Sequence, residues 1–140
     1  MEKLEEFIHV IEKLTDTLNQ MAVVETAKAQ AAASNQPRLL DGYIREEQAA
    51  ILKIRGLEHH RMELAEILGW KDMTFRQILA GASPDGLSLL EPLFHRLEES
   101  LSSLTRARDN SDRMIKVRLH ELETAAAQAA PGAHAAEWRI

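Results

Sequence analysis

The chain has 140 residues, enough for one domain. Its 17 basic and 22 acidic residues give a formal net charge of −5, which argues against nucleic acid as the main partner, because phosphate-binding domains usually carry net positive charge. There are no cysteines, so disulfides, thiolate metal sites and cysteine nucleophiles are excluded. No apolar run approaches the roughly 20 residues needed to cross a bilayer, and the acidic, amphipathic start is unlike a signal peptide. We therefore expect a cytoplasmic protein without membrane insertion.

The first expected helix runs from Glu2 to about Ala33. Its apolar residues recur about every 3.5 positions, the coiled-coil spacing. They form the stripe Leu4, Phe7, Ile8, Ile11, Leu14, Leu18, Met21 and Ala22. Beyond Met21 the helix is rich in alanine, which either lets a neighbouring backbone come close or simply extends the helix; we favour the second interpretation.

The second expected helix begins near Pro37, capped by Ser34 or Asn35, or alternatively after Asp41-Gly42. It ends at Gly69, a residue suited to the left-handed turn that closes a helix. The connection between the first two helices is short, which predicts an antiparallel hairpin.

The apolar stripe of the second helix is interrupted by charge. It comprises Ala50, Ile51, Ile54, Leu57, Leu64, Ile67 and Leu68. Glu47 and Arg61 lie on the same stripe, where their long side chains can reach out of a narrow seam. Gly56 indicates either a tight helix crossing or a tolerated surface glycine.

Thr74 and Gln77 have the spacing of a capping box, which predicts a short helix from Thr74 to Leu79. Four apolar residues in this region are expected to close one end of the bundle: Trp70, Met73, Phe75 and Ile78. After a break over residues 81–86, the third long helix is expected from near Leu87 to near Ala129. Pro92 lies either in its first turn or at a kink.

The third long helix carries two apolar sets that differ in phase. The first is Leu87, Leu90, Leu93, Phe94, Leu97, Leu101 and Leu104, and Arg108, Ser111 and Arg118 then occupy seam positions. The second is Met114, Ile115, Leu119 and Leu122, with Val117 beside it.

The lengths of the helices predict an unpartnered segment. At about 1.5 Å per residue the third helix reaches roughly 60 Å and the first two roughly 45–50 Å, so the third must extend past the hairpin over about residues 119–130. An amphipathic helix without a partner in its own chain predicts a site for another protein.

Catalytic patterns are missing from the sequence. The chain has six histidines, and the His59–Glu63 pair at i,i+4 would need two further ligands to hold a metal. No HExxH motif, glycine-rich phosphate loop or nucleophile elbow occurs, and the paired Glu-x-x-His motifs of a di-metal bundle are also missing. We therefore expect a protein that is not an enzyme and uses no metal or cofactor.

A basic cluster in the third helix allows two interpretations. It comprises Arg106, Arg108, Arg113, Lys116 and Arg118. It is either a solvated face balanced by nearby acidic residues or a surface that recognises an acidic or carbonyl-rich partner. The apolar residues in the same turns favour binding.

The second helix also supports a family resemblance. It reads EEQAAILKIRGLEHHRMEL, close to the pattern EExxAxLxxLxxLExxRxxL, with Glu46, Glu47, Ile51, Leu57, Glu58, Arg61 and Leu64 at the matching positions. An acidic residue, Glu25, precedes it, and a TxRQI-type short helix and a long leucine-bearing helix follow. Over residues 1–125 the chain resembles the FlgN-type flagellar export chaperones. Members of this family often carry paired asparagines in the third helix, followed by two apolar residues. This chain lacks the pair but keeps Asn110 and the apolar Met114-Ile115.

The helical patterns predict an all-α, coiled-coil-like fold over residues 1–130, and Pro131-Gly132 end the last helix, so residues 131–140 are expected to form a flexible tail. The resemblance implies that the helical part is a chaperone domain. It implies that the chain shields hook-associated proteins in the cytoplasm and delivers them to the flagellar type III secretion apparatus, whose components are further expected partners. The expected partner-binding residues are Arg108, Met114, Ile115, Arg118, Leu119 and Leu122. The alternative is a structural coiled-coil module that forms a homodimer through the third helix.

Overall fold

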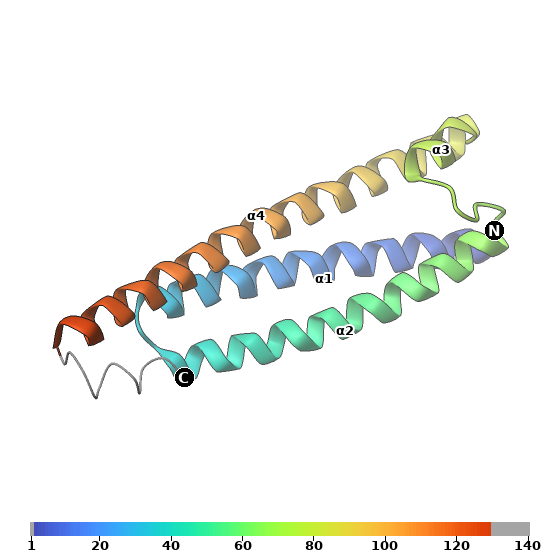
Figure 1. The fold of residues 1–140 in the computed structure, drawn as a ribbon. Helices are drawn as coiled ribbons and strands as arrows, with labels where there is room; N and C mark the ends of the chain where they lie inside the picture. Colours follow the sequence, from blue (N-terminus) through green and yellow to red (C-terminus); the bar gives the residue numbers. More distant parts are fainter. Residues whose placement is uncertain (1, 130–140) are drawn as a thin grey trace.

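The computed structural model describes residues 2–129, which form four helices (Figure 1). They are α1 (Glu2–Ala33), α2 (Pro37–Ile67), α3 (Phe75–Ala80) and α4 (Pro84–Ala129). No strand occurs in this range, so the predicted all-α fold with three long helices and one short helix is confirmed. The expected tail over 131–140 lies outside the described residues.

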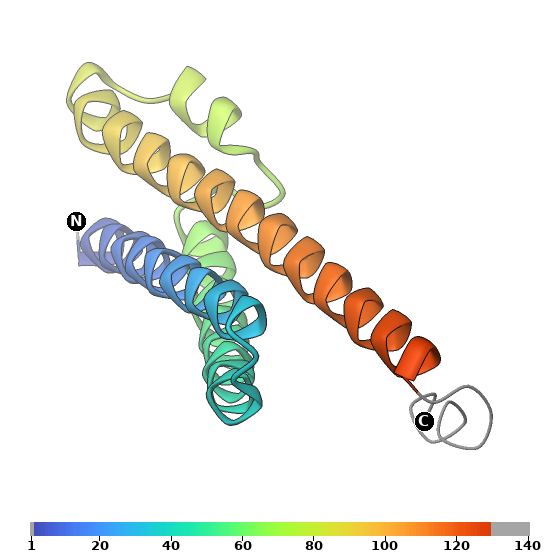
Figure 2. The same cartoon turned by 90° about the vertical axis from the view of Figure 1, so that its left-hand side faces the viewer.

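Helix α1 lies between α2 and α4 (Figure 1). It forms an antiparallel hairpin with α2 and runs parallel to α4, as expected from the sequence. Within residues 2–129, no Cα atom of α2 comes within 8 Å of a Cα atom of α4. In Figure 2, α4 diverges from the hairpin toward its own C-terminal end. Of the three long helices, only α1 therefore has its backbone close to both of the others over residues 2–129.

The connection between α1 and α2 corrects one prediction. Neither Ser34 nor Asn35 caps α2; its N-cap is Gln36, whose side chain makes no capping hydrogen bond. The amides of Ser34 and Asn35 instead donate to the carbonyls of Gln30 and Ala32, at the end of α1. Asn35 takes a left-handed φ of 54°, the conformation that ends a helix. These residues therefore finish α1, and Pro37 begins α2 because its missing N–H costs nothing in a first turn.

The other helix ends follow their local sequence. Gly69 has a φ of 83° and closes α2, as predicted. Thr74 and Gln77 form the expected capping box, each side chain accepting from the other residue's amide, at 3.1 and 2.8 Å. Helix α4 begins at Pro84, three residues before the predicted start, because Ser83 Oγ accepts from the Gly86 amide and so caps it. Pro92 therefore lies inside α4.

Aromatic side chains close the end of the bundle where α4 begins. Phe7 meets Trp70 and Phe94 edge to face at 5.2 and 6.2 Å, and Phe75 stacks on Phe94 at 4.2 Å. Ile78 is buried among the core residues. The predicted plug is therefore present, and it joins α1, α3 and α4 through one ring cluster.

The predicted stripes contain three errors. Ile67, Leu87 and Leu101 are exposed. Ile67 ends α2 and Leu87 lies in the first turn of α4, where neighbouring helices give little cover. Leu101 lies outside the seam because Ser100, one residue earlier, is the buried residue in that turn. The remaining large members of the predicted stripes of α1 and α2, and of the first apolar set of α4, are buried or half-buried.

Candidate binding groove

The character of the core changes along α1. The large buried side chains of α1 end at Met21, and further along the buried residues are Glu25, Lys28 and three alanines. The alanines, Ala29, Ala31 and Ala32, are all less than a tenth exposed. They are packing residues rather than a simple extension of the helix, which corrects the interpretation drawn from the sequence.

An apolar groove of about 200 Å³ lies beside these alanines. Three segments contribute to it: the end of α1, the connection with the first turn of α2, and the late part of α4. Its lining comprises Ala31, Ala32, Asn35, Gln36, Pro37, Leu40, Ile115, Arg118, Leu119 and Leu122. The volume is below the roughly 300 Å³ at which small-molecule pockets begin, and suits one or two side chains of a larger partner.

The register of α1 and α4 explains why the groove forms there. Phe7 of α1 meets Phe94 of α4. Because the two helices run parallel and rise equally per residue, the same difference in residue number places Ala33 of α1 level with about residue 120 of α4. Residues 121–129 therefore extend roughly 13 Å past the end of α1. The overshoot matches the predicted length, but Ile115 and Arg118 precede it. They lie against the last turn of α1, so the site is a groove rather than a bare helix.

The predicted binding residues divide into two groups. Ile115, Arg118, Leu119 and Leu122 all line the groove. Ile115 and Leu122 are half-buried, whereas Leu119 is 55% exposed. Arg108 and Met114 do not line it: Arg108 is exposed on α4, and Met114 is half-buried outside the groove. The geometry therefore brings together the later members of the predicted set.

Sequence reasoning missed the opposite wall of the groove. That wall consists of Ala31 and Ala32 from α1 together with Pro37 and Leu40 from α2. The signal that could have found it is the alanine-rich end of α1, followed after three polar residues by Pro37 and, one residue further on, by two leucines. Small side chains at a helix end leave room that a diverging neighbour does not fill.

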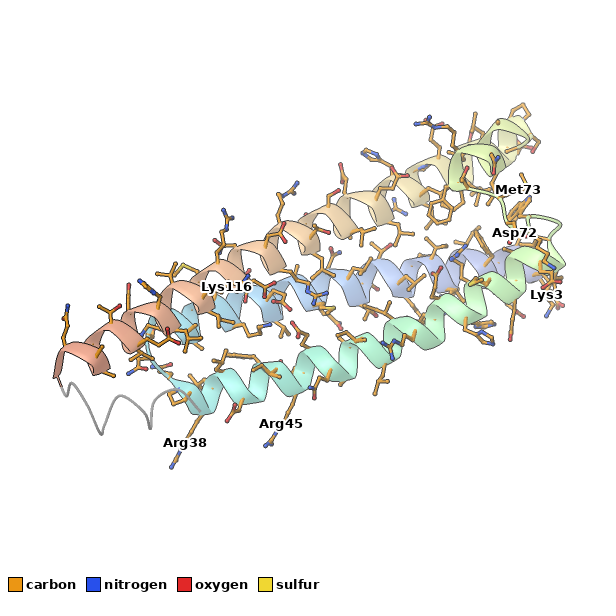
Figure 3. The ribbon with its side chains drawn as sticks, viewed as in Figure 1. Lys3, Arg38, Arg45, Asp72, Met73 and Lys116 are labelled. Atoms are coloured by element: carbon orange, nitrogen blue, oxygen red, sulfur yellow. The ribbon has the colours of Figure 1, made fainter. Side chains whose placement is uncertain are left out.

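The charges around the groove are mixed. Arg118 Nη1 pairs with Glu121 at 3.1 Å, while Arg118 Nε is buried and has no acceptor in the described part of the chain. Arg38 and Arg45 project from α2 away from the other helices (Figure 3). Residues 84–103 of α4 carry four acidic residues and one basic residue, whereas residues 104–129 carry four acidic and five basic ones. The groove therefore lies on the less negative half of α4.

A buried ionic cluster separates the groove from the leucine-rich core. Lys28 Nζ lies 3.2 Å from Glu25 Oε2 and 2.8 Å from Glu47 Oε2, with side chains that are 8%, 0% and 13% exposed. Neither carboxylate oxygen of Glu25 accepts a hydrogen bond in the described structure. Ser111, level with Glu25 on α4 by the same register, is also fully buried, and its hydroxyl has no hydrogen-bond partner among residues 2–129. Glu47 thus pairs across the α1–α2 seam instead of reaching solvent.

Other polar groups form ordinary surface pairs. His59 and Glu63 on α2 lie 2.8 Å apart, and His95 and Glu99 on α4 lie 2.9 Å apart, all well exposed. Within residues 2–129, no group of three or more histidine, aspartate or glutamate side chains could hold a metal ion. Arg61 binds Glu58 and lies over the Phe75 ring, 5.6 Å from its centroid, so it packs as well as pairs.

Comparison of the chain with protein-family models, curated proteins and solved structures finds no match. Among the described helices, none combines the length and apolar character required of a membrane span.

Proposed function

We propose that this protein is a non-catalytic export chaperone of the FlgN type, which binds an amphipathic segment of a hook-associated protein in the cytoplasm and holds it for the flagellar secretion apparatus. The observation that supports this proposal most is the apolar groove between the α1–α2 connection and α4. It is lined by residues from three segments and leaves Leu119 more than half exposed.

The groove suits a protein segment better than a small ligand. Its walls are mostly apolar side chains, its volume holds one or two large residues, and residues 123–129 of α4 continue beyond Leu122, its last lining residue. A helix that places its apolar stripe in such a groove is anchored by residues spaced three or four apart. The client segment would pack on Ile115, Leu119 and Leu122, while the mixed charges around them set its register.

The first experiment compares two leucines of equal exposure on α4. Leu119 is 55% exposed and lines the groove, whereas Leu101 is 53% exposed and lies outside it. Leu119→Asp should weaken binding of a hook-associated protein, measured by calorimetry, by about 2 kcal/mol or more, which is roughly 30-fold. Leu101→Asp should leave the affinity within about threefold of the parent. Equal loss in both variants would show that binding does not use the groove.

A second substitution separates binding from folding. Ile115→Asp should also abolish client binding while circular dichroism and the melting temperature change little, because Ile115 is half-buried at the groove rather than in the core. If Ile115→Asp unfolds the protein, Ile115 belongs to the core and the site assignment is wrong. Sedimentation tests the rival function: a stable dimer that buries α4 would favour the tethering module, and a monomer that forms a one-to-one complex would favour the chaperone.

A further inference from the structure

We propose that, in the absence of a client, the C-terminal segment 130–140 of this chain occupies the groove with Trp138 and Ile140, so that tail and client compete for one site. The competition rests on the proposed function, whereas the docking of the tail does not and can be tested without any client.

The length of the segment fits this assignment. Helix α4 ends at Ala129, seven residues or about 10 Å beyond Leu122. Pro131-Gly132 follow directly, a pair that favours a turn over continued helix. From Gly132, six residues of extended chain span roughly 20 Å. A chain that turns back at Gly132 therefore brings Trp138 level with the stretch from Ile115 to Leu119.

The sequence of the segment fits as well. In extended chain every second residue shares a face, so Ala136, Trp138 and Ile140 lie on one side and Glu137 and Arg139 on the other. The first face is apolar and the second is ionic. A tryptophan buries about 150–250 Å² when it docks, and the groove offers apolar walls to receive it.

Tethering favours the chain's own tail over a second copy of the protein. A short flexible linker gives its two ends an effective concentration in the millimolar range. A second copy is far more dilute than this in a micromolar solution, and its net charge of −5 adds mutual repulsion. A weak apolar contact is therefore made within one chain first.

Disulfide trapping tests the docking, because the natural chain has no cysteine. Ala136→Cys, which leaves Trp138 and Ile140 in place and lies about four residues of α4 nearer to Ala129 than Trp138 does, is combined with Leu119→Cys in one variant and with Val117→Cys in a control. Leu119 and Val117 are 55% and 54% exposed and similarly distant from Ala129, but they point about 160° apart around α4 and only Leu119 lines the groove. The intrachain disulfide to position 119 should form at least about tenfold faster. Equal rates at the two positions, or disulfides mainly between chains, would overturn the proposal.

The competition is tested by removing the tail. If the tail fills the groove nine-tenths of the time, a chain that ends at residue 130 should bind a hook-associated protein about tenfold more tightly. Trp138→Ala should produce most of this gain, and unchanged affinity in both would refute competition. A trapped tail with no binding of hook-associated proteins would uphold docking and overturn the proposed function. If Leu119→Asp abolishes binding of a hook-associated protein but no intrachain disulfide forms between the tail and position 119, the proposed function is upheld and the docking of the tail is overturned.

Discussion

Replacing Lys28 by methionine tests the buried ionic cluster. The substitution removes the only cation within 4 Å of Glu25 in the described structure and leaves Glu25 and Glu47 facing each other across the α1–α2 seam. Removing one partner of a buried ion pair costs about 3–5 kcal/mol, because an uncompensated charge stays buried. All three side chains are at most 13% exposed, so solvent offers little compensation. The expected loss corresponds to a fall in Tm of roughly 10–20 °C for a chain of this size.

The assay is urea unfolding followed by far-ultraviolet circular dichroism, with Lys53→Met as the control. Lys53 is exposed on α2, so the same substitution there should change the free energy of unfolding by no more than about 0.5 kcal/mol. A triple variant, Glu25→Leu with Lys28→Met and Glu47→Leu, should be as stable as the parent or more stable by about 1–4 kcal/mol. A loss under about 1 kcal/mol in Lys28→Met would refute the reasoning, because the carboxylates would then not depend on the lysine.

Three further substitutions test the packing and the helix ends by the same unfolding measurement. Phe94→Ala should cost about 3–5 kcal/mol, because it removes the ring that both Phe7 and Phe75 contact; a cost near 1 kcal/mol would show a loosely packed end. Thr74→Ala should cost about 0.5–2 kcal/mol through loss of the cap on α3, and Thr74→Ser should retain most of the stability. Gly56→Ala should stabilise by about 0.5–1 kcal/mol, since no atom of the described residues lies within 4 Å of an added Cβ; destabilisation would indicate a hidden close approach.

Local sequence signals predicted the helices well, because each signal acts within a few residues. The stripe of α1, the capping box at Thr74 and the left-handed turn at Gly69 all have the expected structure. The error in capping arose where two adjacent helices compete for the same residues. Ser34 and Asn35 suit either the end of α1 or the start of α2, and only the hydrogen bonds of the folded chain show which helix they complete.

The candidate site was predictable only in part. The late apolar set of α4 pointed to Ile115, Leu119 and Leu122, and these residues line the groove. Its other wall depends on how far α4 diverges from α1, a property of three-dimensional packing that helix periodicity does not encode. The sequence left two interpretations of Gly56 open. No atom of residues 2–129 would lie within 4 Å of a Cβ added there, which favours a tolerated surface glycine over a tight helix crossing.

Because the backbones of α2 and α4 lie apart, the amino-acid sequences of these two helices can change largely independently of each other. Over residues 2–129 no Cα atom of α2 lies within 8 Å of one of α4, whereas both helices approach α1 this closely. The changes in unfolding free energy caused by substitutions on α2 and on α4 should therefore add almost independently, whereas substitutions on α1 alter its packing against both helices. One outer helix can thus accumulate changes and acquire a new specificity while the other keeps its sequence, provided that α1 stays the same.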